Sequence, residues 1–343
     1  MAPAPDGRCV TLGAAAARSL ALILGIGCVL ALTGCDRAVR TAFALVTDPP
    51  PRLPAEREIH DLPYAVPASD GKMELGAGDR RTPDQRLVDD PKHRYDLFLP
   101  AVEPGWPVVV FVHGGGWTSG DRDLAFGDFE VYGAIGRRLA MQGIGAAVIS
   151  YRLQPSVTWR EQVEDVAYAT AAAADEAAAR GADRRRLFVS GHSAGAQLAT
   201  YAAVRGDLLA AAGVDEVCGV AAISGAGYDL ADERTYALGA QRAYYEERFD
   251  TGDGWQREAS AMTWLDADDP PMLLLFGREE WPSLQYQNRL LADRLGTLGI
   301  RYTLRDVRGT GHRRMVVEAS DPDEPVLRSL VEFVRSTPCG DAS

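Results

Sequence analysis

The chain contains a serine in a setting typical of a covalent nucleophile, within the segment Gly191-His192-Ser193-Ala194-Gly195. The apolar residues 187–190 before it predict a short buried strand, and the Ala-rich residues 194–203 predict a helix. A serine on the sharp turn between such a strand and helix presents its hydroxyl for attack, and the flanking glycines let the two backbones approach closely. Because G-x-S-x-G also occurs in ordinary turns, the motif needs support from elsewhere in the chain.

That support comes from a second motif, His113-Gly114-Gly115-Gly116-Trp117, which directly follows the apolar residues 107–112. A run of glycines exposes backbone N–H groups, and such groups can stabilise the negative charge that develops on a carbonyl oxygen under attack. The two motifs occur in the order that this chemistry requires, each after an apolar strand. Together they predict a hydrolase that works through a serine nucleophile.

The elements that must position both motifs alternate between strand and helix patterns from about residue 93 onward. The predicted strands cover residues 93–100, 108–112, 145–151, 187–190, 217–224, 272–276 and 301–307. The predicted helices cover the segment with Tyr132, Ile135 and Leu139, residues 161–180, 194–203 and 284–295, and the segment with Val326, Leu330 and Phe333. This alternation predicts an α/β fold with a mostly parallel central sheet and helices on both faces.

The chain divides into an N-terminal part and one large domain. Residues 35–90 are rich in Pro, Asp and Arg, and we interpret them as a tether and a loosely packed N-terminal segment. We expect the domain over residues 91–338, because 343 residues with 46% hydrophobic composition can bury one large core. Residues 225–269 are rich in Tyr, Phe and Trp and lie between two predicted strands. We interpret them as a short cap-like insertion that forms a modest apolar pocket.

The first 34 residues have the pattern of a targeting segment. Arg8 and Arg18 precede an apolar stretch over residues 20–32, and the stretch ends at Leu32-Thr33-Gly34-Cys35, which resembles a bacterial lipobox. This resemblance predicts a lipoprotein signal peptide over residues 1–34 and lipidation of Cys35. The mature protein would then be an exported bacterial lipoprotein, anchored at the extracytoplasmic face of a membrane. An uncleaved anchor or a plain secretory signal is the alternative.

Charge and cysteine content limit the remaining partners. The net charge of −12 without a basic cluster disfavours nucleic acid. Outside the N-terminal segment the cysteines are Cys218 and Cys339. We interpret Cys218, in an apolar run, as a small core residue, and a disulfide between the two is the alternative. No spacing of Cys and His indicates a metal site, and the sequence leaves the oligomeric state open.

The two motifs, with the segments Ile149-Ser-Tyr-Arg-Leu-Gln-Pro155 and Ile223-Ser-Gly-Ala-Gly-Tyr-Asp-Leu230, resemble the α/β-hydrolase superfamily. More narrowly, the chain resembles hormone-sensitive-lipase-like carboxylesterases, including relatives of isoprenylcysteine methylesterase and arylformamidase. The resemblance covers about residues 93–336 and implies the α/β-hydrolase fold and a small-molecule ester substrate, with no cofactor. It also implies that the backbone N–H groups of Gly115, Gly116 and Ala194 form the oxyanion hole.

The same resemblance implies a triad in the order serine, acid, histidine. His312 is the only histidine after Ser193, and it follows the last predicted strand, so we predict that it is the base in a loop. The family carries Gly-x-x-Asp after the penultimate strand, and this chain has Gly277-Arg278-Glu279-Glu280. Register favours Glu280 as the acid, and Glu279 is the alternative. We interpret Asp266, Asp268 and Asp269 as turn residues.

Three further residues, His113, Asp165 and Trp117, have roles that follow from their place in the sequence, and three functions of the protein remain open. We expect His113 to shape the glycine loop and Asp165 to make a structural hydrogen bond, and Trp117 either lines a pocket or packs in the core. The leading function is hydrolysis of small to medium acyl or aryl esters through an acyl-enzyme. An arylformamidase or amidase with the same triad is the nearest alternative. A non-catalytic binding protein on a hydrolase fold is the third.

Overall fold

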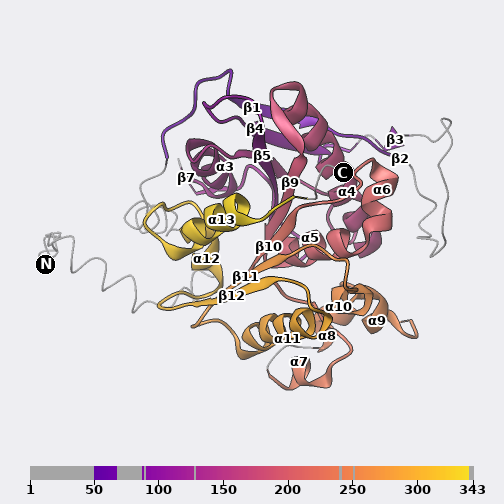
Figure 1. The fold of residues 1–343 in the computed structure, drawn as a ribbon. Coiled ribbons are helices and arrows are strands. Elements are labelled where there is room, and N and C mark those ends of the chain that lie inside the picture. The colour runs from indigo at the N-terminus through magenta and orange to yellow at the C-terminus, as the bar shows by residue number, and fades with distance from the viewer. Residues whose placement is uncertain are drawn as a thin grey trace, which may run out of the picture.

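The computed structural model describes residues 50–67, 87–88, 90–126, 129–238, 242–249 and 252–339 (Figure 1). The predicted signal peptide and Cys35 lie outside these residues, as does most of the predicted tether. Within the described part of the chain, no helix combines the length and apolar character needed to cross a membrane.

A central sheet of eight strands organises the fold, in the order β1-β4-β8-β5-β9-β10-β11-β12. The strands are β1 (Glu58–Pro63), β4 (Arg94–Phe98), β5 (Trp106–Val112), β8 (Gly145–Ile149), β9 (Ala182–His192), β10 (Gly219–Ile223), β11 (Met272–Gly277) and β12 (Tyr302–Val307). From β8 to β12 all neighbours are parallel, whereas β4 is antiparallel to both β8 and β1. Two small two-stranded sheets pair β2 (Val66–Pro67) with β3 (Leu87–Val88) and β6 (Ala125–Phe126) with β7 (Phe129–Glu130).

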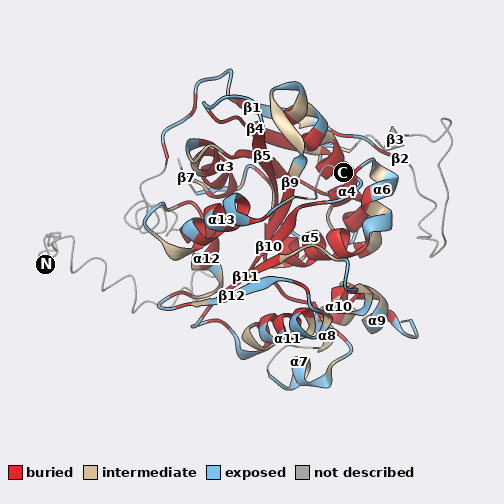
Figure 2. Ribbon diagram, viewed as in Figure 1, coloured by how far each residue is buried: buried red, intermediate tan, exposed pale blue. Residues whose placement is uncertain are grey.

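Helices cover both faces of the sheet, and each face has its own apolar core. The α4 (Trp159–Ala179), α5 (Ala194–Val204), α6 (Gly206–Ala212) and α11 (Pro282–Leu298) helices contribute to one core, and α3 (Val131–Met141), α12 (His312–Glu318) and α13 (Pro325–Ser336) contribute to the other. Strand β5 serves both, because Val108, Val110 and Val112 face the first core while Val109 and Phe111 face the second. Figure 2 shows β5, β10 and β11 buried between these layers, whereas the edge strand β12 is largely exposed. The predicted mostly parallel α/β architecture is confirmed.

One strand of the central sheet lies within residues 35–90, which the sequence analysis interpreted as a tether and a loosely packed N-terminal segment. Strand β1 extends the sheet beyond β4, with Ile59 opposite Leu97. Its buried Glu58 receives hydrogen bonds from Arg137 of α3 (Nε–Oε1, 2.9 Å), Arg52 and the Leu53 N–H. Burial alone would raise the pKa of Glu58, but these hydrogen bonds lower it to about 2. The strand was missed because a long-range ion pair, rather than an alternating apolar pattern, fixes it.

The insertion between β10 and β11 consists of four short helices: α7 (Glu233–Ala237), α8 (Arg242–Glu246), α9 (Trp255–Ala259) and α10 (Ala261–Trp264). Several of its aromatic side chains are buried against the core of the domain. Tyr245, Phe249 and Trp255 are buried, and Phe249 packs edge-on against Trp117 at 4.8 Å between ring centroids. These aromatics therefore attach the insertion to the core.

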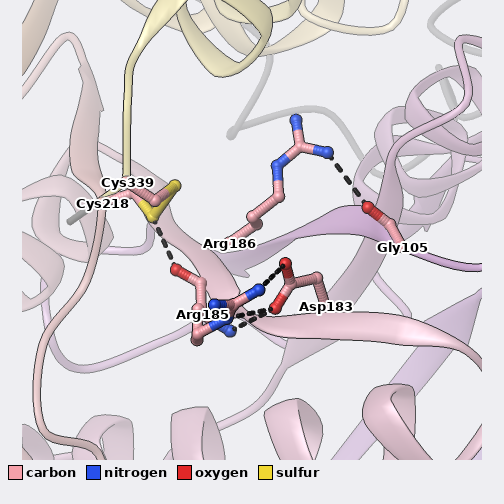
Figure 3. The surroundings of a disulfide bond; sticks show 6 residues. All are labelled: Gly105, Asp183, Arg185, Arg186, Cys218 and Cys339. Carbon is pink, nitrogen blue, oxygen red and sulfur yellow. Dashed lines mark hydrogen bonds and ion pairs between the residues drawn. A yellow bond between two sulfur atoms is a disulfide. The ribbon is translucent and has the colours of Figure 1, made fainter. Parts of the chain in front are cut away.

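A disulfide joins Cys218, just before β10, to Cys339, after α13 (Figure 3). Cys218 lies in the core as interpreted, and the disulfide that the sequence analysis gave as the alternative is formed as well. The two cysteines are 121 residues apart in sequence, and their Cα atoms are 4.7 Å apart. Sequence could not reveal the pairing because only the packing of α13 against the sheet brings Cys339 to Cys218.

Candidate active site

Ser193 lies at the turn between β9 and α5, as its motif predicts. Its backbone has φ 56° and ψ −120°, a conformation that side chains rarely adopt and that costs about 1–3 kcal/mol. The flanking glycines are required by space. A Cβ on Gly191 would lie 2.4 Å from the Gly195 carbonyl oxygen, and a Cβ on Gly195 would lie 2.3 Å from the carbonyl oxygen of Val112. The turn therefore tolerates only glycine two positions before and two positions after Ser193.

His312 meets Ser193 across 119 positions of sequence, with 2.9 Å between Nε2 and the serine Oγ. It is the first residue of α12, a short helix, whereas we expected it in a loop. In the tautomer that carries its proton on Nδ1, the imidazole accepts a hydrogen bond from the Ser193 hydroxyl. This is the geometry that a general base needs in order to remove the serine proton.

Glu280 is the acidic residue that faces His312. Its Oε1 lies 3.7 Å from His312 Nδ1 and accepts a hydrogen bond from Ser224 Oγ, and its side chain is fully buried. At 3.7 Å the two atoms are beyond hydrogen-bond distance, and among the described residues Nδ1 has no hydrogen-bond partner. Hydrogen bonds in active sites are often long without substrate and shorten when it binds.

Glu279, the alternative acid, has a different task. Its carboxylate accepts the N–H groups of Gly309 at 3.0 Å and Thr310 at 2.5 Å, so it braces the turn that leads to His312. Asp266 and Asp269 lie in a turn, since the Asp266 N–H donates to Asp269 Oδ2. The geometry therefore brings together Ser193, His312 and Glu280, and their catalytic roles stay predictions.

The glycine loop after β5 runs across the serine. A Cβ on Gly114 would lie 3.3 Å from the Cβ of Ser193, and Gly115 and Gly116 have φ values of +132° and +60°, which favour glycine. The Gly114 N–H donates to Tyr132 Oη at 3.0 Å, so it is already engaged. The N–H groups of Gly115, Gly116 and Ala194 remain the predicted oxyanion donors.

His113 contacts the glycine loop through its buried side chain. Its ring stacks on Tyr151 at 4.3 Å, and its Nδ1 lies 2.7 Å from the Gly114 carbonyl oxygen. Burial lowers the pKa of His113 to about 4, so the ring is neutral near pH 7. Both observations agree with a shaping role and with no part in proton transfer.

His192, which the sequence analysis did not single out, is a further residue of the site. Its Nε2 lies 2.9 Å from the carbonyl oxygen of His312, and the two rings are 4.8 Å apart. Burial, and then the neighbouring His312, lower the pKa of His192 to about 3. The neutral ring of His192 therefore donates a hydrogen bond to the carbonyl oxygen of His312 and helps to hold His312 in place. The variable position of G-x-S-x-G was the only sequence signal for it.

Trp117 and Asp165 have structural roles in the fold. Trp117 is buried and donates from Nε1 to Gln197 Oε1 at 3.0 Å, so it packs in the core. Asp165 is buried and accepts hydrogen bonds from the side chain and backbone N–H of Arg152. The insertion reaches the glycine loop through Arg248, whose Nε donates to the Gly116 carbonyl oxygen at 3.1 Å.

Comparison with known proteins identifies the family of this chain. A family model described as BD-FAE matches residues 95–295, which is more than half of the chain. The chain belongs to the BD-FAE family. The match includes the glycine loop, Ser193 and Glu280 but ends before His312. The predicted resemblance to the carboxylesterases of the α/β-hydrolase superfamily is confirmed.

Individual relatives cover less of the chain. A probable isoprenylcysteine alpha-carbonyl methylesterase from Oryza sativa subsp. japonica is 39% identical over 113 residues, which is 32% of this chain and 25% of that protein. Esterase LipC from Mycobacterium tuberculosis is 29% identical over 60% of this chain and 53% of its own length. The structure of esterase B from Lactobacillus rhamnosis matches with a TM-score of 0.63 and 21% identity over 88% of this chain and 90% of that one. The chain thus spans about a quarter of the first of these relatives, and the structural likeness confirms the α/β-hydrolase fold.

Proposed function

We propose that this protein is a serine carboxylic-ester hydrolase that acts through an acyl-enzyme. The observation that carries the proposal is the 2.9 Å contact between Ser193 Oγ and His312 Nε2, at a turn that presents the hydroxyl beneath a glycine loop. The named esterases among its relatives support the reaction class.

The proposed reaction has two steps. In the first, His312 Nε2 takes the Ser193 proton as the oxygen attacks the ester carbonyl, while Glu280 stabilises the resulting imidazolium. The N–H groups of Gly115, Gly116 and Ala194 stabilise the oxyanion. The imidazolium then protonates the leaving alcohol. In the second step water, activated by His312, attacks the acyl-enzyme and releases the acid and Ser193.

We propose small to medium acyl or aryl esters as substrates. The motif over residues 223–230, shared with arylformamidases, performs structural work in this fold: the Gly225 carbonyl accepts from Asn288 Nδ2 at 3.0 Å, and the Tyr228 N–H donates to Gln287 Oε1 at 2.9 Å. These hydrogen bonds are structural and do not distinguish an ester from a formamide substrate.

Hydrolysis of p-nitrophenyl esters from acetate to palmitate tests this proposal. We expect the rate to peak at short chains and to fall to background in Ser193→Ala. The exposed Ser156 offers a matched control, since Ser156→Ala removes a hydroxyl away from the predicted triad and should keep the wild-type rate. Ester turnover that survives in Ser193→Ala would refute the mechanism. Turnover of aryl formamides but of no ester by folded protein would favour the formamidase.

We further propose that the protein is exported and anchored through a lipid on Cys35. The lipobox-like sequence before Cys35 and the Cys218–Cys339 disulfide support this, because disulfides persist in oxidising compartments. In a bacterial host, Cys35→Ala should move the protein out of the membrane fraction. Cys28→Ala, seven positions earlier in the apolar stretch, should not. Equal membrane association of both variants would contradict the lipid anchor.

A further inference from the structure

Trp281 is an apolar side chain left exposed beside the predicted base. Its exposed fraction is 62%, the largest among the exposed large apolar side chains of the described residues. Its ring lies 5.2 Å from the ring of His312, at an interplanar angle of 38°. A single exposed aromatic side chain is ordinary, but the contact with His312 places this ring within reach of a ligand bound at Ser193.

The backbone holds Trp281 in a fixed place. The residue before it, Glu280, donates its N–H to the Gly277 carbonyl at 3.2 Å, and the residue after it, Pro282, begins α11. The Trp281 carbonyl accepts the N–H of Leu284 at 3.0 Å. Because the main chain is held on both sides, the ring can contact a ligand without a large loss of backbone entropy.

The buried aromatics of the insertion strengthen this assignment. Tyr245, Phe249 and Trp255 are covered by protein and contact one another and the core. These three cannot bind a substrate ring without being displaced, and the exposed Tyr244 of the insertion lies at Gly116, on the oxyanion side of the site. Trp281 lies outside the insertion, on the loop between β11 and α11, and it keeps its face open to solvent.

The position of Trp281 identifies which half of an ester it would contact. His312 Nε2 must deliver its proton to the leaving oxygen, so that oxygen comes within about 3 Å of Nε2. The group attached to the leaving oxygen then continues along the His312 side of the site. The oxyanion, in contrast, lies at the glycine loop. The Trp281 ring, packed against His312, is therefore beside the alcohol half.

We propose that Trp281 is a specificity-determining residue that stacks on an aromatic ring in the alcohol half of the ester. This inference rests on the proposed ester hydrolysis and deepens it by assigning the aromatic group to the leaving alcohol. Aromatic pairs of this kind contribute about a tenfold effect in favourable cases. The leaving aryl alcohol takes its proton from the His312 imidazolium, and the acyl group stays on Ser193 until water releases it.

Three esters separate the possible roles of the ring. Benzyl acetate carries the ring in the alcohol half, and its isomer methyl phenylacetate carries it in the acyl half. Butyl acetate has no ring but forms the same acetyl-enzyme as benzyl acetate, so the two differ only in acylation. For the full-length protein, we expect Trp281→Ala to lower kcat/KM for benzyl acetate about tenfold more than for either other ester. Trp281→Phe should retain most of the benzyl preference.

Tyr302→Ala is the matched control, because Tyr302 is an exposed aromatic at the start of β12, at the other end of the strands. It should leave the ratios among the three esters unchanged. An equal loss on all three in Trp281→Ala would mean that Trp281 only supports His312. A larger loss on methyl phenylacetate would move the ring to the acyl half, and an unchanged kcat/KM for all three esters would remove Trp281 from recognition; each of these results would overturn the inference. If the wild-type protein hydrolyses none of the three esters or the p-nitrophenyl series, the proposed function fails, and the inference with it.

Discussion

The carboxylate of Glu280 can be removed with almost no change in shape by Glu280→Gln. In the wild-type protein the buried carboxylate faces His312 Nδ1 at 3.7 Å and receives the Ser224 hydroxyl. The amide keeps an acceptor for Ser224 but loses the negative charge. It can also present an N–H₂ group to Nδ1, which favours the tautomer that cannot accept the serine proton.

The magnitude follows from the distance and the burial. For unit charges 3.7 Å apart, an effective dielectric constant of about 20 gives an attraction of roughly 4 kcal/mol, whereas bulk water would give about 1 kcal/mol. The Glu280 side chain is fully buried and that of His312 is 15% exposed, so the lower dielectric constant applies. Because the imidazolium forms only during the reaction, this energy is lost from the transition state. We therefore expect kcat/KM to fall about 10³-fold.

The assay is p-nitrophenyl acetate hydrolysis with purified variants whose thermal unfolding is measured in parallel. Glu279→Gln is the matched control, one residue away and chemically the same change. It removes charge from the brace at Gly309 and Thr310, so we expect a loss of no more than about tenfold. Glu280→Asp restores the charge at a greater distance and should recover part of the rate. If Glu280→Gln kept a tenth of the activity, or if Glu279→Gln lost more than it, the assignment of the acid would be wrong.

Three other predictions test the fold around the site. Gly195→Ala should abolish activity or soluble expression, because the added Cβ would lie 2.3 Å from two backbone carbonyl oxygens. Gly206→Ala is the control and should be neutral, because no described atom lies within 4 Å of its added Cβ. Equal soluble yield and equal esterase activity of the two variants would contradict the packing at Gly195. Cys339→Ser should lower the free energy of unfolding, measured in urea, by about 3–5 kcal/mol, because the disulfide closes a loop spanning 121 positions. A reductant should destabilise the wild-type protein but have no further effect on this variant. An unchanged urea midpoint in Cys339→Ser would argue against the bond. The free energy of unfolding should fall as the pH drops from about 6.5 towards 4, because His113 and His192 become protonated in the unfolded chain while burial holds their pKa values in the folded protein at about 4 and 3. For His113 the loss of stability is roughly 3 kcal/mol by pH 4. Urea midpoints that stay constant between pH 6.5 and 5 would refute this prediction.

Local patterns were sufficient for much of the fold. Apolar runs predicted β5, β8, β9 and β11 because parallel strands covered on both faces must be apolar throughout. Strand β1 was not predicted, because it buries the charged Glu58. Hydrogen bonds from Arg137 and Arg52 make this burial possible, and the pattern of apolar residues along the strand does not indicate them. The burial of the aromatics of the insertion was not predicted either, because composition does not say whether Phe249 faces solvent or Trp117.

The sequence by itself determined the turn that holds Ser193, because the geometry of this short motif is local. The turn at Ser193 needs glycines on both sides because neighbouring backbone atoms leave no room for a Cβ, so the motif and its structure imply each other. Only the tertiary structure decided which carboxylate faces His312 and what orients that base. Adjacent residues project in different directions from the loop after β11, so Glu280 reaches Nδ1 while Glu279 turns to Gly309 and Thr310. Likewise, His192 and His312 meet only because parallel strands end at one edge of the sheet, where residues distant in sequence come within hydrogen-bond distance.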